Sequence, residues 1–160
     1  MKRSILCTLA FSLFWVCGCG KGANEAFEKG KACLDKKDFD AAITAFTEAI
    51  RLDPKATNYY DRGWSYGKKG DYDKAIGDDT EAIRLNPKFA LAYQNRGIAF
   101  GSKGEHDKAI ADFIEVIRLD PKNAGAYYCQ GIAYEKKGDK AKAEEDFAQA
   151  KKLGYKGKQD

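Results

Sequence analysis

Histidine, proline and long apolar runs are scarce in this chain of 160 residues, and each scarcity excludes a class of protein. The single histidine, His106, has no second imidazole to share a metal, and no serine–histidine or cysteine–histidine arrangement for catalysis can be assembled around it. A mean hydropathy of −0.59 excludes a protein with many membrane spans. The net charge of +4, from 28 basic and 24 acidic residues, is too small and too evenly mixed for a nucleic-acid-binding surface. We therefore expect no enzymatic activity, no metal, no cofactor and no nucleic-acid partner.

The first twenty residues differ in character from the rest of the chain. Lys2 and Arg3 give a positive start, and the twelve residues Ile5–Val16 then carry no charge. This run is shorter than the roughly 20 apolar residues that a membrane-spanning helix needs. A positive start, a short apolar run and small residues at its end are typical of a secretory signal peptide. The sequence therefore predicts an exported protein.

Two cysteines follow the apolar run, in the stretch Val16-Cys17-Gly18-Cys19. A metal site would need further ligands at suitable spacing, and a phosphate-binding loop would need a preceding strand and a following helix, so neither is favoured. The stretch resembles the lipobox of bacterial lipoproteins, although Cys17 stands where alanine, serine or threonine is usual. The resemblance implies that the Cys19 thiol takes a diacylglycerol and that residues 1–18 are removed. The alternative is an ordinary signal peptide that is cleaved nearby.

The lipobox resemblance also implies a location for the mature protein. Two or three acyl chains at Cys19 would anchor it stably, because a single chain gives only marginal binding. Residues 19–22 would then be the lipidated cysteine and a short linker. Residue 20 is glycine, whereas aspartate there retains many lipoproteins in the inner membrane of Gram-negative bacteria. We expect a lipid-anchored protein of the bacterial cell envelope that faces the periplasm, with the outer membrane favoured in a Gram-negative host.

From residue 23 onward the sequence repeats itself with a period of about 34 residues. The stretch K-G-D-Y-D-K-A-I at 69–76 returns as K-G-E-H-D-K-A-I at 103–110 and as K-G-D-K-A-K-A-E at 137–144. Four units are expected, followed by a short tail. Their boundaries are 23–55, 56–89, 90–123 and 124–157, and the tail is 158–160.

Each unit is predicted to contain two helices. In the second unit, Tyr59, Gly63 and Tyr66 have the spacing of one helical face. The pair Gly70-Asp71 then marks a break, because glycine adopts the left-handed conformation of a helix end and aspartate can cap the next helix. A proline ends each of the first three units: Pro54, Pro87 and Pro121. A single unit cannot bury its apolar faces alone, so neighbouring units are expected to stack.

The third unit resembles the tetratricopeptide repeat. The residues that match the signature of that repeat are Tyr93, Gly97, Phe100, Ala109, Phe113, Val116 and Pro121. The resemblance covers residues 23–157 and implies an all-α, right-handed solenoid of about four helix-turn-helix repeats. Recurring aromatic residues are expected in the core: Tyr59, Tyr66, Tyr93, Phe100, Tyr127 and Tyr134. Asp79 stands where the other three units have phenylalanine, and a lone acid on a packing face is costly. Because Gly77 also weakens this helix, we expect the second helix of the second unit to be the least stable part of the stack.

The resemblance further implies a concave groove, lined by the first helix of each unit, that holds an extended peptide or a helix of a partner protein. The residues expected to line it are Phe27, Lys31, Tyr60, Asp61, Trp64, Lys68, Gln94, Asn95, Ile98, Tyr128 and Ile132. Whether Tyr60 and Trp64 face the groove or are buried between helices stays open at this stage. A clamp for a terminal carboxylate is not favoured, because acidic residues offset its few basic ones. Arg62 and Arg96 are expected to make hydrogen bonds or salt bridges between helices.

Two cysteines, Cys33 and Cys129, remain besides Cys19 after export. They lie in the first helices of units one and four, roughly 25–30 Å apart if packed helices are about 8–10 Å from one another. A disulfide requires α-carbons within about 7 Å. Both cysteines are therefore predicted to be free thiols.

The leading functional hypothesis is an exported, lipid-anchored adaptor that binds a protein or peptide in its groove. Assembly of pili or of outer-membrane proteins is a narrower hypothesis by analogy with small lipoproteins of this kind. The alternative is an accessory protein that binds cell-wall glycan or peptidoglycan, with Trp64 and Tyr60 stacking on sugars.

Overall fold

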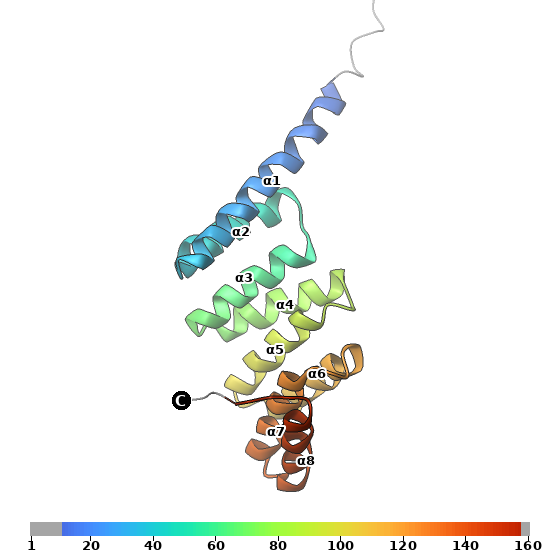
Figure 1. The fold of residues 1–160 in the computed structure, drawn as a ribbon. Helices are drawn as coiled ribbons and strands as arrows, with labels where there is room; N and C mark the ends of the chain where they lie inside the picture. Colours follow the sequence, from blue (N-terminus) through green and yellow to red (C-terminus); the bar gives the residue numbers. More distant parts are fainter. Residues whose placement is uncertain (1–10, 158–160) are drawn as a thin grey trace, which may run out of the picture.

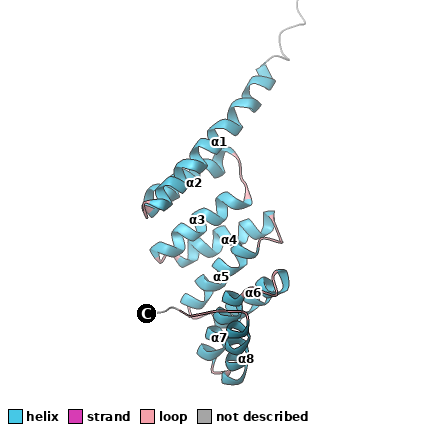
Figure 2. Ribbon diagram, in the orientation of Figure 1, coloured by secondary structure: helices cyan, strands magenta, loops and turns pink. Residues whose placement is uncertain are grey.

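The structure is a computed structural model and describes residues 11–157. Within that range it contains eight helices and no strand (Figures 1 and 2), so the all-α prediction is confirmed. The helices are α1 (Phe11–Asp35), α2 (Phe39–Leu52), α3 (Ala56–Lys69), α4 (Tyr72–Leu85), α5 (Ala90–Ser102), α6 (His106–Leu119), α7 (Ala124–Lys137) and α8 (Lys140–Lys152). Each helix packs against the one before and the one after it, and α5 also contacts α3 and α7. The result is an elongated stack of helical hairpins.

The first helix begins earlier than the repeat pattern predicts. It starts at Phe11 and continues past residue 22 to Asp35 without a break, so its first part extends beyond α2 (Figure 1). Residues 19–22, predicted as a linker, are helical here. Residues 1–10 of the predicted signal peptide and the tail 158–160 lie outside the described residues, as does the Cys19 side chain on which lipidation was predicted. Among the described residues, no helix is both long and apolar enough to cross a bilayer.

The helix ends follow the local chemistry of the sequence. Gly70 has φ +83°, and the N–H of Asp71 bonds to the Tyr66 carbonyl, which closes α3 as the glycine predicted. Asp38 caps α2 by accepting the Ala41 N–H at 3.1 Å. Asp71, however, makes no side-chain cap on α4. Its carboxylate instead lies 3.5 Å from the Lys74 ammonium.

The core of the stack is built largely from alanine, with only a few large side chains. Phe46 and Val116 are fully buried and Phe113 nearly so. The recurring aromatic residues of the first helices, expected in the core, are instead half-buried. Cationic side chains lie over most of these rings: the Arg62 guanidinium lies 5.8 Å from the Tyr59 centroid, for example. These rings therefore pack at the edge of the core.

Two buried arginine–aspartate pairs join the helices, as expected for Arg62 and Arg96. Arg96 donates from Nε and Nη2 to both carboxylate oxygens of Asp112, at 2.9 and 2.7 Å, and from Nη1 to the Thr80 hydroxyl at 3.1 Å. Arg62 makes the same bonds to Asp78 and Thr47 one repeat earlier. Each arginine thus connects both helices of its own repeat to the second helix of the preceding repeat.

The fourth repeat lacks this arginine. Gln130 occupies the position of Arg96 and is buried, and the Oδ2 atom of Asp146, the counterpart of Asp112, is buried without a hydrogen-bond partner. Burial raises the pKa of Asp146 to about 6. The last repeat therefore carries an unpaired acid where the two central repeats carry a bidentate ion pair.

Gln130→Arg is expected to stabilise the protein by about 1–2 kcal/mol at pH 7, since it supplies charged hydrogen bonds to an unpartnered carboxylate. The gain is limited because Ile114 replaces the threonine that accepts the third bond in the central repeats. Chemical denaturation measures the gain, and NMR titration of the Asp146 carboxyl should show its pKa falling. Ala141→Arg adds the same charge at an exposed position of α8 and serves as the control. An unchanged pKa of Asp146 would contradict the pairing.

Candidate functional site

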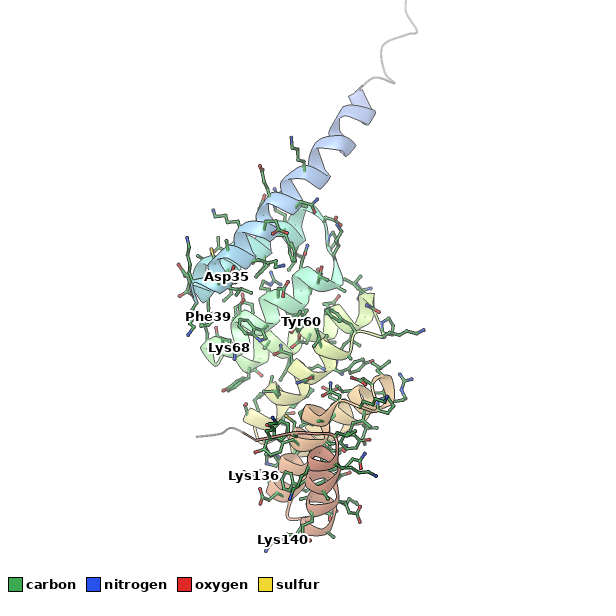
Figure 3. All side chains as sticks on the ribbon, in the orientation of Figure 1. Asp35, Phe39, Tyr60, Lys68, Lys136 and Lys140 are labelled. Carbon is green, nitrogen blue, oxygen red and sulfur yellow. The ribbon has the colours of Figure 1, made fainter. Side chains whose placement is uncertain are left out.

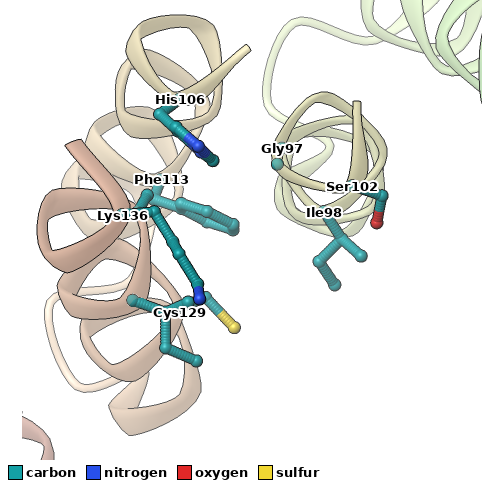
Figure 4. Close-up of a pocket in the computed structure, with 10 residues that line it drawn as sticks. Gly97, Ile98, Ser102, His106, Phe113, Cys129 and Lys136 are labelled. Carbon is teal, nitrogen blue, oxygen red and sulfur yellow. The ribbon is translucent and has the colours of Figure 1, made fainter. Parts of the chain in front are cut away.

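Two neighbouring clefts lie between the first helices of the second, third and fourth repeats. The smaller, which we call the small cleft, has a volume of about 120 Å³ and is lined by Trp64, Gly67, Lys68, Tyr72, Asn95, Ile98 and Ala99. The larger, the large cleft, has a volume of about 330 Å³ and is lined by Gly97, Ile98, Gly101, Ser102, His106, Phe113, Cys129, Ile132, Ala133 and Lys136 (Figure 4). Ile98 lines both, so the two clefts form one continuous surface across α3, α5 and α7.

The two clefts are the same place in successive repeats, and their sizes differ because of particular substitutions. The indole of Trp64 occupies in the small cleft the position that the shorter Ile98 occupies in the large one. Lys68 is likewise replaced by Ser102, and Tyr72 by His106. In Figure 4 the Phe113 ring extends between α5 and α7. The large cleft is therefore wide because the third repeat has smaller side chains at its edge.

Five of the predicted groove residues line these clefts, and the structure brings them together on one surface. They are Trp64, Lys68, Asn95, Ile98 and Ile132. Trp64 is half-buried: its ring meets the Phe39 ring edge-on at 5.9 Å, and the Lys68 ammonium lies 4.9 Å from its centroid. Asp35, Lys68 and Lys136, at equivalent positions of their repeats, follow one side of the stack (Figure 3). The open question about Trp64 is thus answered: it borders a cleft.

Three predicted aromatic residues contact other rings of the chain and line neither cleft. Tyr60 packs against Phe89 at 5.1 Å between ring centroids. Tyr128 stacks on Tyr155 from the segment after α8, at 4.3 Å. Phe27 packs against the buried Phe46 at 5.9 Å. Sequence spacing placed these rings on the correct helices, but the aromatic partners come from segments between helices or from other helices, which spacing within one helix does not reveal.

The remaining predicted residues lie on the same helices outside the clefts. Lys31 is exposed, with its ammonium 5.7 Å from the Phe27 centroid. Gln94 is half-buried. Asp61 is also half-buried, and burial raises its pKa to about 6 against the opposing charge of Lys31. Lys31, Asp61 and Gln94 therefore line neither cleft.

His106 lines the large cleft but was not among the groove residues predicted from the sequence. Its Nδ1 atom is buried and has no hydrogen-bond partner. The repeat alignment could have indicated this position, because His106 is equivalent to Tyr72, which lines the small cleft. Cys129 also lines the large cleft as a free thiol, and burial raises its pKa. Cys33 in α1 is free as well. No cluster of histidine, cysteine and acidic residues suited to a metal occurs among the described residues.

Asp79 lies fully buried directly behind the small cleft, with 0% of its surface exposed. Its Oδ2 atom accepts a hydrogen bond of 2.6 Å from Nδ2 of Asn95, a residue of the next repeat that lines the cleft. Its Oδ1 atom is buried without a partner. Burial raises the pKa of Asp79 to about 8. A buried acid with one satisfied oxygen thus holds the amide of Asn95 in the wall of the cleft.

Comparison with known proteins identifies the repeats. Models of the tetratricopeptide repeat match residues 23–56, 60–113 and 124–153, and a model described as TPR repeat matches residues 99–138. A crystal structure of MamA is 32% identical, covers 82% of this chain and 77% of its own, and superposes with a TM-score of 0.79. The chain belongs to the tetratricopeptide repeat family. A search of curated proteins finds no match.

Two further tetratricopeptide repeat structures are similar at lower identity. The TPR domain of Arabidopsis OM64 is 29% identical, with coverage of 73% of this chain and 98% of that one and a TM-score of 0.72. The second TPR domain of human RPAP3, solved in complex with the HSP70 peptide SGPTIEEVD, is 27% identical, with coverage of 72% and 97% and a TM-score of 0.70. In this family such repeats typically act as interaction modules.

Proposed function

We propose that this tetratricopeptide repeat protein is an exported, lipid-anchored adaptor that binds a segment of a partner protein along α3, α5 and α7. The observation that carries the proposal is the pair of adjacent clefts that share Ile98, because a row of clefts suits an extended ligand better than a single small molecule. The RPAP3 domain, solved in complex with a peptide, supports a peptide as the class of ligand. The protein would act as a preformed surface without chemistry of its own.

The membrane anchor is the second part of the proposal. It rests on the sequence Val16-Cys17-Gly18-Cys19 behind a short apolar run. The mature protein would begin at Cys19, inside the span of α1, and its acyl chains would hold the stack at a membrane of the bacterial envelope. A role in assembling pili or outer-membrane proteins is the narrower form of this proposal.

Mass spectrometry of the mature amino terminus tests the anchor directly. The proposal requires that residues 1–18 are absent and that Cys19 carries lipid. A Cys19→Ala variant should leave the membrane fraction. An amino terminus at another residue, or an unmodified Cys19, would overturn the anchor and leave the repeat surface unaffected.

Binding to cell-wall glycan is the alternative function, and the half-buried Trp64 at the small cleft is the observation in its favour, because an indole face can stack on a sugar. Tyr60 does not offer its ring to a sugar in this structure, since the ring packs against Phe89. Parallel pull-downs on purified cell wall and on envelope proteins distinguish the two. Retention on the wall without a protein partner would favour glycan binding, and the reverse would favour the adaptor.

A further inference from the structure

One wall of the small cleft is polar because a residue of the core, Asp79, differs from its counterparts in the other repeats. In the three other repeats, the position of Asp79 is occupied by Phe46, Phe113 and Phe147, and each of these rings packs against the glycine of its own first helix. In the third repeat, Phe113 belongs to a buried apolar cluster against which Cys129 of the next repeat packs. The second repeat replaces this apolar contact by a hydrogen bond between Asp79 and Asn95.

This replacement is costly for the fold. The Oδ1 atom of Asp79 is buried and unpartnered, and a buried polar atom left without a hydrogen bond costs about 1–3 kcal/mol. A polar residue at a position that is apolar in the other repeats, kept at such a cost in stability, is expected where function requires it. The one group that Asp79 holds by a side-chain hydrogen bond is the amide of Asn95.

The hydrogen bond fixes the orientation of that amide. The NH2 group of Asn95 donates to Oδ2 of Asp79, so it turns inward and the carbonyl oxygen of Asn95 turns the other way. The Asn95 Oδ1 atom lies on the side of Gly67, 3.9 Å from the point where a Cβ on that glycine would stand. Gly67 also lines the small cleft, and its missing side chain leaves the approach to this oxygen open.

We propose that Asp79 is a positioning residue that orients Asn95 so that its carbonyl oxygen accepts a hydrogen bond from a backbone N–H of the partner segment in the small cleft. The partner is thus an extended protein segment with a free backbone N–H opposite the carbonyl oxygen of Asn95. The apolar sides of Trp64 and Ile98 flank the acceptor. This inference rests on the proposed function for the identity of the ligand, but the orientation of Asn95 is a property of the free protein.

The orientation is tested on the free protein by NMR. One side-chain amide proton of Asn95 should exchange slowly in the wild type, because it is hydrogen-bonded to the fully buried carboxyl group of Asp79. Asp79→Phe should make both protons exchange rapidly, and Asp79→Asn, which keeps an acceptor oxygen, should restore the protection. Rapid exchange in the wild type, or protection that persists in Asp79→Phe, would overturn the positioning role.

Binding is tested by photocrosslinking. A photoreactive residue is placed at position 132, which lies in the large cleft and away from Asp79, and the yield of crosslinked partner is measured. Asp79→Phe and Asn95→Ala should each reduce the yield about tenfold, the loss expected for one hydrogen bond of about 1.4 kcal/mol. The double variant should reduce the yield no further than either single variant. Asp79→Asn should bind like the wild type. An Asp79→Phe variant that binds normally while Asn95→Ala does not would overturn the inference. A wild type that captures nothing would instead refute the proposed function, and the NMR result would still decide the orientation.

Discussion

Replacing Asp79 by phenylalanine and Asn95 by cysteine together is expected to raise the free energy of unfolding by about 3 kcal/mol at pH 7. The pair copies Phe113 and Cys129, which occupy the same positions one repeat later; Phe113 belongs to a buried cluster and Cys129 packs against that cluster. The change removes a buried oxygen without a partner, worth about 1–3 kcal/mol, and buries a phenyl ring, worth about 1.5–3 kcal/mol. Gly63 already leaves room, as Gly97 does for Phe113.

Urea denaturation of the wild type, the double variant and each single variant measures this effect. Asp79→Phe alone should gain less, because it leaves the amide of Asn95 without its acceptor. Asn95→Cys alone should destabilise, because it removes the hydrogen bond to a buried acid. A double variant no more stable than the wild type would show that Asp79 is accommodated without cost.

The same residue makes stability depend on pH. The pKa of Asp79 in the folded protein is about 8, against 3.8 ordinarily, mainly because of burial. The hydrogen bond from Asn95 and the charge of Arg96 oppose this rise, and the charges of Asp78 and Asp112 add to it. The folded state therefore keeps a proton on Asp79 that the unfolded chain releases. The stability that this proton contributes is fully present below about pH 4 and is lost as the pH rises to about 8, by as much as roughly 1.4 kcal/mol per pH unit.

Denaturation between pH 5 and pH 8.5 measures that slope. Asp61 and Asp146, whose pKa values burial raises to about 6, steepen its acidic part. Asp79→Asn should remove the slope between pH 6.5 and 8.5, since no group titrates at position 79 in that variant. A wild type that becomes more stable as the pH rises through this range would contradict the raised pKa.

Arg96→Met is expected to destabilise the protein by about 3–5 kcal/mol. The substitution leaves Asp112, whose side chain is only 6% exposed, as a buried charge without its partner. It also removes the bond to Thr80 that joins the third repeat to the second. The pKa of Asp112, which burial already raises against the charge of Arg96, should rise further. Thermal or chemical denaturation measures the loss.

Two variants separate the buried charge from the mere loss of an arginine. Arg96→Met with Asp112→Leu should recover most of the stability, because replacing both partners of a buried pair by apolar residues is often nearly neutral. Arg118→Met removes an arginine from an exposed pair with Glu115 and should cost at most about 1 kcal/mol. Equal losses in Arg96→Met and Arg118→Met would show that burial of the pair contributes nothing.

Much of the fold follows from the sequence because each signal is local and recurs. The glycine at position 70 predicts a left-handed helix end, and the structure has one there. Asp71 shows the limit of such signals: it precedes α4 as Asp139 precedes α8, but only Asp139 caps its helix. The early start of α1 at Phe11 was not predicted either, because the repeat pattern begins only at residue 23.

The candidate site was less predictable because it depends on contacts between repeats. Spacing along α3 and α5 assigns Trp64 and Ile98 to one surface, and both line the small cleft. It does not reveal that Phe89, in the turn before α5, packs against Tyr60. The sequence marks Asp79 as an exception to the repeat, but its partner Asn95 lies sixteen residues away in another helix and becomes apparent only when the helices are stacked.

Photocrosslinking along the stack tests the central claim, that the clefts across α3, α5 and α7 bind a segment of a partner protein. A photoreactive residue is placed in turn at position 64, 98 or 132 within the clefts and at the exposed position 111 of α6 as a control. The claim predicts that the three cleft positions capture the same protein through one contiguous segment and that position 111 captures none. Capture from position 111 at equal yield, or no protein captured from any cleft position, would contradict it.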